Sequence, residues 1–189
     1  MTEEPVFGDR YRILWRSVRP GCVAEVRNYA IDRRGYRTVP VRLADSLMQR
    51  ISMRFVATSW GERGPEIMVS KAFMALPMNF REAAIWHEVG HIHYEHHFHF
   101  QLEFQDQSQL RAARISAVQK GEVMPHETQA DRFATERVGK DAFTGFLGHL
   151  LKTRPRGKGW NDIGSRELEL RIAIIDALDS CEPAHELGA

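Results

Sequence analysis

The sequence predicts an α+β fold in which a small sheet packs on helices, and two observations lead to this prediction. Short runs rich in β-branched and aromatic residues, bounded by turn residues, are concentrated in the part of the chain up to residue 78. From residue 79 onward, apolar residues recur at the three- and four-residue spacing of amphipathic helices. Strands that precede helices, rather than alternate with them, are typical of an α+β domain with a mixed or antiparallel sheet.

Four segments of the first part have the composition of strands, and a short helix is expected between the second and the third. The strands are predicted over Val23 to Ile31, Thr38 to Leu43, Arg54 to Ser59 and Glu66 to Ser70, and the short helix over Asp45 to Met53. The first two strands flank turn residues 32–35, and the last two flank a Gly/Pro-rich loop at residues 61–65. Residues 1–20 have no pattern that predicts an element.

The second part of the chain is predicted to form a series of helices. The first begins after Asn79, a suitable N-cap, and runs to about Glu95 or His97. The others are predicted over Ser108 to Lys120, from Pro125 onward, over Asp141 to Leu151 and over Ser165 to Leu178. Proline suits the first turn of a helix because its missing N–H has no intrahelical partner there. Residues 1–189 are therefore expected to form one domain, β-rich up to residue 78 and helical from residue 79.

The composition limits the classes of partner and the compartment. The net charge is +1 with histidine neutral, which argues against a general nucleic-acid binder or a membrane-surface protein. No basic region followed by an apolar stretch opens the chain, and no apolar run has membrane-spanning length, so neither a signal peptide nor a membrane span is expected. The two cysteines, Cys22 and Cys181, fit reduced thiols. The expected protein is cytoplasmic, and no feature of the sequence indicates its oligomeric state.

The first predicted helix carries the pattern H-E-x-x-H, as His87-Glu88-Val89-Gly90-His91. Residues four apart lie on one face of a helix, so His87 and His91 can bind one metal ion together. Glu88 lies next to them and can act as a general base toward a water molecule held by that metal. The pattern therefore indicates a zinc-dependent hydrolase.

A catalytic zinc ion usually has three protein ligands, and the third ligand is the open question. Glu95 is excluded by distance, because at 1.5 Å per residue it lies roughly 12 Å along the helix from His87. His97 has the spacing of the third histidine in metzincins. Tyr94, however, stands where that motif has the glycine that allows the chain to turn back.

Glu127 is the favoured third ligand, and His97 remains the alternative. Glu127 lies on the helix predicted from Pro125, and Asp131 follows it by four residues on the same face. Glu127 can thus bind the metal while Asp131 accepts a hydrogen bond from the second ring nitrogen of a histidine ligand, which fixes the imidazole tautomer.

The two motifs together resemble those of the gluzincin metallopeptidases. They are H-E-V-G-H at residues 87–91 and E-T-Q-A-D-R-F-A at residues 127–134, and the similarity in layout extends over residues 66–175. Two branches are most similar, namely the HtpX/CAAX-protease-like peptidases, with H-E-x-x-H and E-x-x-A-D, and the soluble ImmA/IrrE-type peptidases, with E-x-x-A-x-x-F-A. Arg171-Ile172 also resembles the Arg-Ile of the closing helix in the first branch, whereas Ser165-Arg166 stands at its His-Pro.

This resemblance implies a zincin-like fold and one zinc ion per chain, bound by His87, His91 and Glu127. Glu88 would be the general base, and Asp131 would support a histidine ligand. The implied activity is that of a zinc metalloendopeptidase, which hydrolyses a peptide bond in a peptide or protein substrate.

The resemblance further implies that the substrate pairs along the edge of the strand at residues 66–70, through Ile67, Met68 and Val69. Two alternatives remain open for the function. One is an ImmA/IrrE-like protease specific for one regulator protein, and the other is a non-catalytic zincin-like binding or regulatory protein.

Several weaker signals surround the motif. The histidines between His93 and His99 are expected to belong to a solvated helix end rather than to a second metal site. Cys22 is expected to be an ordinary thiol, with a zinc-bound thiolate that keeps the enzyme latent as the alternative. Tyr94 and His149 are possible hydrogen-bond donors to a reacting carbonyl oxygen.

Overall fold

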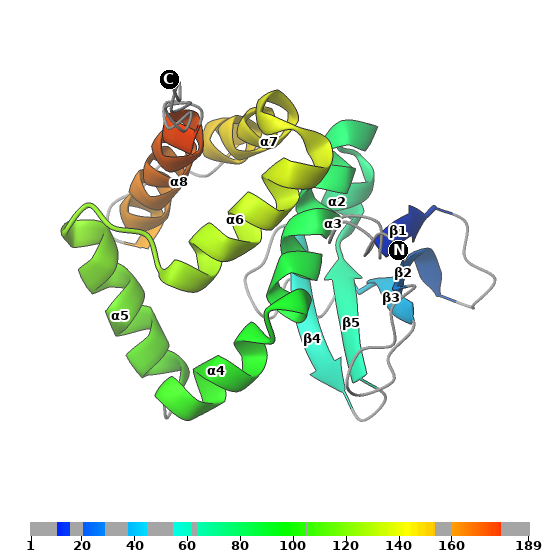
Figure 1. Cartoon of the computed structure of the whole chain (residues 1–189), viewed down its shortest axis with the longest axis horizontal. Helices are drawn as coiled ribbons and strands as arrows, with labels where there is room; N and C mark the ends of the chain where they lie inside the picture. The colour runs from blue at the N-terminus through cyan, green and yellow to red at the C-terminus, as the bar shows by residue number, and fades with distance from the viewer. Residues whose placement is uncertain are drawn as a thin grey trace, which may run out of the picture.

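The computed structural model describes residues 11–15, 21–28, 38–44, 55–61, 64–104, 106–153 and 160–178. Over these residues it contains a five-stranded mixed sheet and a helical C-terminal part, so the predicted α+β class is confirmed. Figure 1 shows the sheet on one side of the helix labelled α3 and the helices α6, α7 and α8 on the other. In the same part of the chain, no helix is long and apolar enough to cross a membrane.

The sheet has the strand order β1-β2-β3-β5-β4. Its strands are β1 (Tyr11–Leu14), β2 (Cys22–Asn28), β3 (Thr38–Leu43), β4 (Val56–Gly61) and β5 (Gly64–Val69). β3 and β5 are parallel and every other pair is antiparallel. Four of the strands match the four predicted segments, whereas β1 was not predicted because four residues are too few to show a periodicity. The predicted turn at residues 32–35 and the predicted helix at residues 45–53 lie outside the described residues.

Seven helices follow the strands within the described residues. They are α2 (Lys71–Met74), α3 (Met78–His93), α4 (His96–Glu103), α5 (Gln107–Gln119), α6 (Pro125–Val138), α7 (Lys140–Thr153) and α8 (Trp160–Ala177). α5, α6, α7 and α8 match the last four predicted helices, and α8 begins five residues before the predicted Ser165. Pro125 lies in the first turn of α6, as predicted.

The helix with the H-E-x-x-H pattern differs from its prediction at both ends. It begins at Met78 because the carbonyl of Pro77 accepts the first backbone hydrogen bonds, from the N–H groups of Phe80 and Arg81. Asn79 is therefore inside the helix and is not its N-cap. At the other end α3 stops at His93, and Glu95 adopts a left-handed conformation with a φ of 56° before α4 begins.

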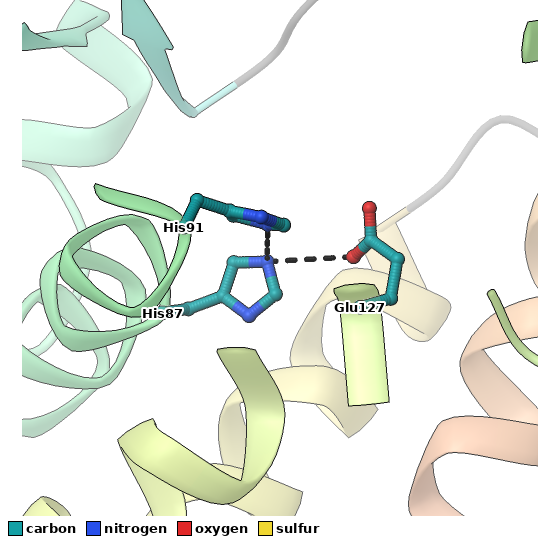
Figure 2. A group of neighbouring side chains, drawn as sticks. All are labelled: His87, His91 and Glu127. Carbon is teal, nitrogen blue, oxygen red and sulfur yellow. Dashed lines mark hydrogen bonds and ion pairs between the residues drawn. The ribbon is translucent and has the colours of Figure 1, made fainter. Parts of the chain in front are cut away.

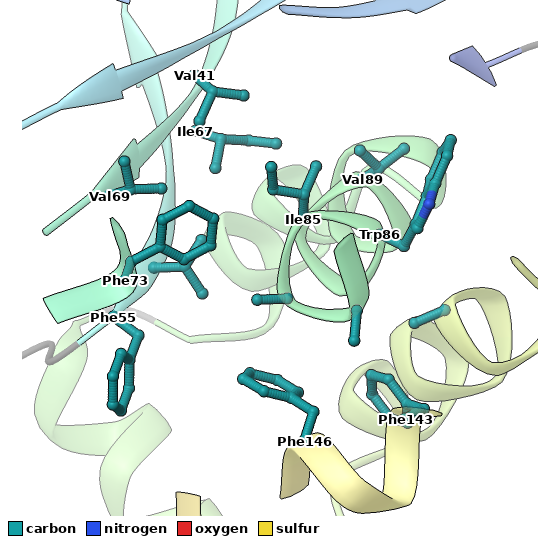
Figure 3. Close-up of a cluster of buried hydrophobic side chains, with 14 of the residues drawn as sticks. Val41, Phe55, Ile67, Val69, Phe73, Ile85, Trp86, Val89, Phe143 and Phe146 are labelled. Carbon is teal, nitrogen blue, oxygen red and sulfur yellow. The ribbon is translucent and has the colours of Figure 1, made fainter. Parts of the chain in front are cut away.

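α3 lies between the sheet and the C-terminal helices, and its middle is buried on all sides. Every residue from Ala83 to Gly90 is buried, which is typical of a helix at the centre of a fold rather than at its surface. The sheet side of the core contains Val41, Ile67, Val69, Ile85 and Val89, and the helix side contains Phe143 and Phe146 (Figure 3). This packing fixes the position of α3 and hence of the histidines that it carries.

Candidate metal centre

His87, His91 and Glu127 form a compact group of possible metal ligands. Each offers one ligand atom, and these atoms lie within 4.8 Å of one another (Figure 2). The Nε2 atoms of His87 and His91 are 3.0 Å apart, and His87 Nε2 lies 3.4 Å from Glu127 Oε2. Metal bonds of 2.0–2.2 Å in a tetrahedron place neighbouring donor atoms about 3.3 Å apart. The group therefore has the size of a metal site, and its nitrogen and oxygen donors fit zinc.

Close packing of α3 against α6 brings the three residues together. Gly90 lies between the two histidines in sequence and faces Ala130, which lies between Glu127 and Asp131. A Cβ atom on Gly90 would be only 2.9 Å from the Cα atom of Ala130. Only glycine at this position allows the two helices to approach so closely, and the approach sets the distance from Glu127 to the histidines.

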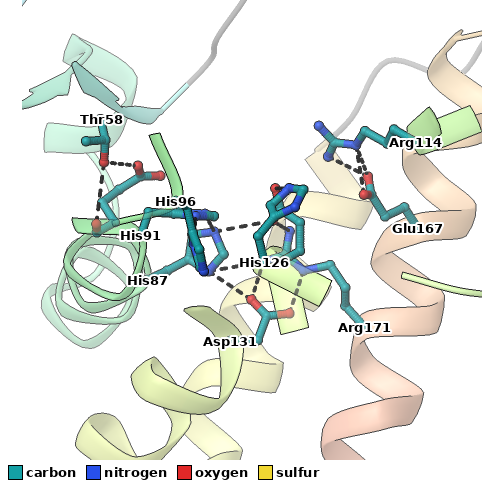
Figure 4. Close-up of polar contacts among 11 residues, drawn as sticks. Thr58, His87, His91, His96, Arg114, His126, Asp131, Glu167 and Arg171 are labelled. Carbon is teal, nitrogen blue, oxygen red and sulfur yellow. Dashed lines mark hydrogen bonds and ion pairs between the residues drawn. The ribbon is translucent and has the colours of Figure 1, made fainter. Parts of the chain in front are cut away.

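Asp131 and Arg171 hold the far side of the group, as Figure 4 shows. Asp131 Oδ1 lies 2.8 Å from His87 Nδ1, so the ring nitrogen that faces away from the ligand group is held by a carboxylate. Arg171, on α8, donates from Nε to Asp131 Oδ2 at 2.6 Å and also pairs with Oδ1. Its Nη1 atom lies 3.2 Å from Glu127 Oε2. Arg171 thus joins both carboxylates of α6 and completes the support of His87.

The two histidines differ in their affinity for a proton. Burial lowers the pKa of His87, but its hydrogen bonds with Asp131 and Glu127 outweigh burial and raise this pKa to about 9. Burial also lowers the pKa of His91, and the adjacent charge of His87 lowers it further, so it lies well below the usual value. In the metal-free protein near neutral pH, His87 is therefore positively charged, with a proton on each ring nitrogen, and His91 is neutral. A metal ion that binds here must displace the Nε2 proton of His87.

Glu127 is ionised and Glu88 binds its proton more tightly than usual. Burial favours the neutral form of Glu127, but the positive charge of Arg171 and hydrogen bonds from His126 and His87 hold its pKa well below the usual range. Burial raises the pKa of Glu88, although His87 and Thr58 oppose the rise. An ionised Glu127 suits a metal ligand, and a raised pKa suits a group that exchanges protons with a substrate.

Thr58 holds the carboxylate of Glu88, and the sequence did not indicate it. Its hydroxyl donates a hydrogen bond to Glu88 Oε2 at 2.6 Å. Thr58 lies in the middle of β4, so this hydrogen bond links β4 to the carboxylate on α3. No motif marks a single threonine in a strand, so only the packing of β4 on α3 identifies it.

His96 also lies at the site, which corrects the prediction of a solvated helix end. Its side chain is 3% exposed, and its Nδ1 atom lies 2.8 Å from His91 Nδ1. Its Nε2 atom lies 2.8 Å from Gln129 Oε1, on α6. Burial lowers the pKa of His96. His93 is likewise packed rather than solvated, because its ring stacks on Phe133.

The remaining candidate residues lie outside the ligand group. His97 stacks on Trp60 with ring centroids 5.4 Å apart, and it is not brought to His87 and His91 as Glu127 is. Cys22 is a partly buried thiol on β2 and is not part of the ligand group. Tyr94 stacks on His96, and His149 packs against Phe55 and Phe80.

The predicted substrate strand needs a correction. Ile67, Met68 and Val69 belong to β5, which pairs with β3 on one side and with β4 on the other. These residues are buried, and the nearly continuous apolar run that suggested a strand is typical of a central one. β5 therefore has no free edge for a peptide. The edge strand next to it is β4, at the end of the described sheet.

Comparison with protein-family models, curated proteins and solved structures finds no significant match to this chain. The similarity to gluzincins thus depends on the motif residues themselves. The structure adds their arrangement in space: the ligand atoms of the three residues lie within 4.8 Å of one another, and Asp131 contacts His87.

Proposed function

We propose that this chain is a zinc-dependent metallopeptidase of the gluzincin type. The observation that supports the proposal most is the convergence of His87, His91 and Glu127 from two helices, with their ligand atoms within 4.8 Å of one another. Two imidazoles and one carboxylate are typical of catalytic zinc sites, which leave the fourth position for water. A bound zinc ion would supply Lewis-acid activation of a water molecule and of the substrate carbonyl group.

The chain's own residues prepare the site for this chemistry. Asp131 accepts a hydrogen bond from Nδ1–H of His87, so the Nε2 lone pair of His87 faces the ligand group once the Nε2 proton has left. Arg171 balances the charges of Asp131 and Glu127, which keeps both carboxylates ionised inside the protein. The ligands are therefore oriented by partners that do not themselves bind the metal.

Glu88 would act as the proton carrier of the reaction. The hydrogen bond from Thr58 occupies Oε2 and leaves Oε1 to accept a proton from the attacking water. The same carboxyl group would then return this proton to the nitrogen of the leaving amine as the C–N bond breaks. The raised pKa of Glu88 favours the first step, because this carboxylate accepts a proton more readily than an exposed glutamate does.

β4 is the strand along which we propose that the substrate lies. It is the end strand of the described sheet, and Thr58 in its middle touches the catalytic carboxylate. An extended peptide can add to such an edge through backbone hydrogen bonds. A peptide bound there would run beside Glu88, whereas the interior of β5 gives no such access.

The test is the cleavage of an unfolded protein, with zinc content measured on the same samples. Wild type is expected to hold about one zinc ion per chain and to cleave casein. Glu88→Gln is expected to keep zinc and lose cleavage, and Glu127→Ala is expected to lose both. His97→Ala, the neighbouring control outside the ligand group, is expected to retain both.

Each outcome has a distinct meaning. Full cleavage by zinc-loaded Glu88→Gln would remove Glu88 from the mechanism. Zinc binding without cleavage of any unfolded protein would favour a protease specific for one regulator or a non-catalytic zinc protein. Wild type without zinc, even after metal is supplied, would contradict the proposal.

A further inference from the structure

The two motif histidines are supported by different chemical groups. His87 is held by a carboxylate, whereas His91 is held by another histidine, His96. The contacts continue from His96 Nε2 to Gln129 Oε1, so a chain of two contacts, each 2.8 Å long, leads from His91 to the surface of α6. Figure 4 shows the rings of His91 and His96 side by side at the ligand group.

The donors and acceptors of these two contacts set the tautomer of each ring. An amide oxygen only accepts hydrogen bonds, so His96 Nε2 carries a proton and donates a hydrogen bond to Gln129 Oε1. A neutral His96 then has no proton on Nδ1, and this atom accepts a hydrogen bond from Nδ1–H of His91. The Nε2 atom of His91 is left without a proton, and this is the atom that lies 3.0 Å from His87 Nε2 in the ligand group.

The contact between His91 and His96 depends on a strained turn. On a continuous helix, residues five apart lie about 140° round the axis, too far for their rings to meet. The break at Tyr94 and Glu95 removes this separation. Glu95 is the only non-glycine residue with positive φ among the described residues, a conformation that costs about 1 kcal/mol or more. The chain thus accepts strain at the turn that places His96 on His91.

We propose that His96, together with Gln129, is a positioning residue that fixes the tautomer and orientation of His91 for metal binding. The inference rests on the proposed metal site and deepens it. His96 does not touch the metal. It supports His91 as the carboxylate of Asp131 supports His87, but without adding a negative charge to the site.

The test measures the zinc dissociation constant by competition with a chromophoric chelator. His96→Ala is expected to weaken zinc binding about 10–100-fold, the usual loss when a partner of a metal ligand is removed. His96→Asn is expected to recover most of this loss, because its Oδ1 atom takes the place of Nδ1 and accepts the proton of His91. His96→Gln places its oxygen nearer to the former Nε2 and is expected not to recover it. His97→Ala is the matched control and is expected to bind zinc as wild type does.

Nitrogen-15 spectra of the imidazole rings in zinc-loaded wild type give a second readout, which needs no variant. The expected tautomers carry the proton on Nδ1 of His91 and on Nε2 of His96. A proton on Nδ1 of His96 would overturn the inference, even if His96→Ala failed to fold. Wild-type zinc affinity in folded His96→Ala would also overturn it while leaving the proposed metal site intact. Wild type that binds no zinc would instead contradict the metal site, and with it this inference.

Discussion

Gly90 offers the sharpest test of how the proposed metal centre is assembled. A Cβ atom placed on it would lie 2.9 Å from Ala130 Cα, 3.2 Å from the carbonyl oxygen of Ala130 and 3.3 Å from Ala130 Cβ. Carbon atoms are at their optimal separation at about 3.5–4.0 Å. Two of the three neighbours are backbone atoms, which cannot rotate away. Gly90→Ala must therefore move α3 and α6 apart by about 0.5 Å or more.

The structure sets the magnitude of both expected effects. Overpacking costs about 1–3 kcal/mol, and alanine is favoured over glycine inside a helix by about 1 kcal/mol, so the loss of stability is about 0–2 kcal/mol. Metal binding is more sensitive, because ligand distances must hold to about 0.2 Å. A shift of α6 moves Glu127 away from the histidines of α3. We expect the zinc dissociation constant of Gly90→Ala to rise on the order of tenfold or more.

Gly148 on α7 provides the control. No atom lies within 4 Å of a Cβ built there, so Gly148→Ala is expected to stabilise the protein by about 0.5–1 kcal/mol and to leave zinc binding unchanged. Urea unfolding and chelator competition measure the two quantities for both variants. If Gly90→Ala bound zinc like wild type and were stabilised like Gly148→Ala, the proposed dependence of the site on this helix contact would be refuted.

Two further predictions follow from His87 and Glu95. The pKa of His87 is about 9 in the folded protein against 6.5 when unfolded. The contribution of this residue to the free energy of unfolding is therefore complete below pH 6.5 and is lost as the pH rises through 9. Urea unfolding of the metal-free protein is expected to show a loss of about 3 kcal/mol between these pH values, and a free energy that stays constant would contradict the assignment. Glu95→Gly is expected to raise the free energy of unfolding by about 1 kcal/mol, since glycine adopts its left-handed φ without strain. An equal gain for Glu95→Ala would show that strain is not the cause.

Local patterns predicted the elements that have strong periodicity. The helices from Pro125 onward follow from apolar spacing and capping, and the four longer strands follow from composition. The break between α3 and α4 could not be predicted, because neither Gly nor Pro marks it. The contact of His96 with His91 and Gln129 accompanies this break, and such a contact between distant segments is not visible in local sequence.

The same distinction holds for the proposed metal centre. Glu127 and Asp131 were predictable because their spacing places them on one face of a helix. Thr58 and His96 were not, since one belongs to a strand and the other follows an unmarked helix break. The sequence also did not show that β5 is paired on both sides, because an apolar run does not indicate whether the edges of its strand are paired.

Arg171 finally explains how two carboxylates can stay ionised inside this protein. Asp131 is 3% exposed, and its charge and that of Glu127 both face the guanidinium group. Removing one partner of a buried ion pair costs about 3–5 kcal/mol when the other charge is left uncompensated. Arg171→Met keeps an apolar stem and should impose part of this cost on the metal-free protein, because protonated His87 still contacts both carboxylates. A zinc ion would supply positive charge at the same carboxylates, so the loss should be smaller when zinc is present. Urea unfolding with and without zinc measures both values, and an equal loss would mean that Arg171 acts through packing rather than charge.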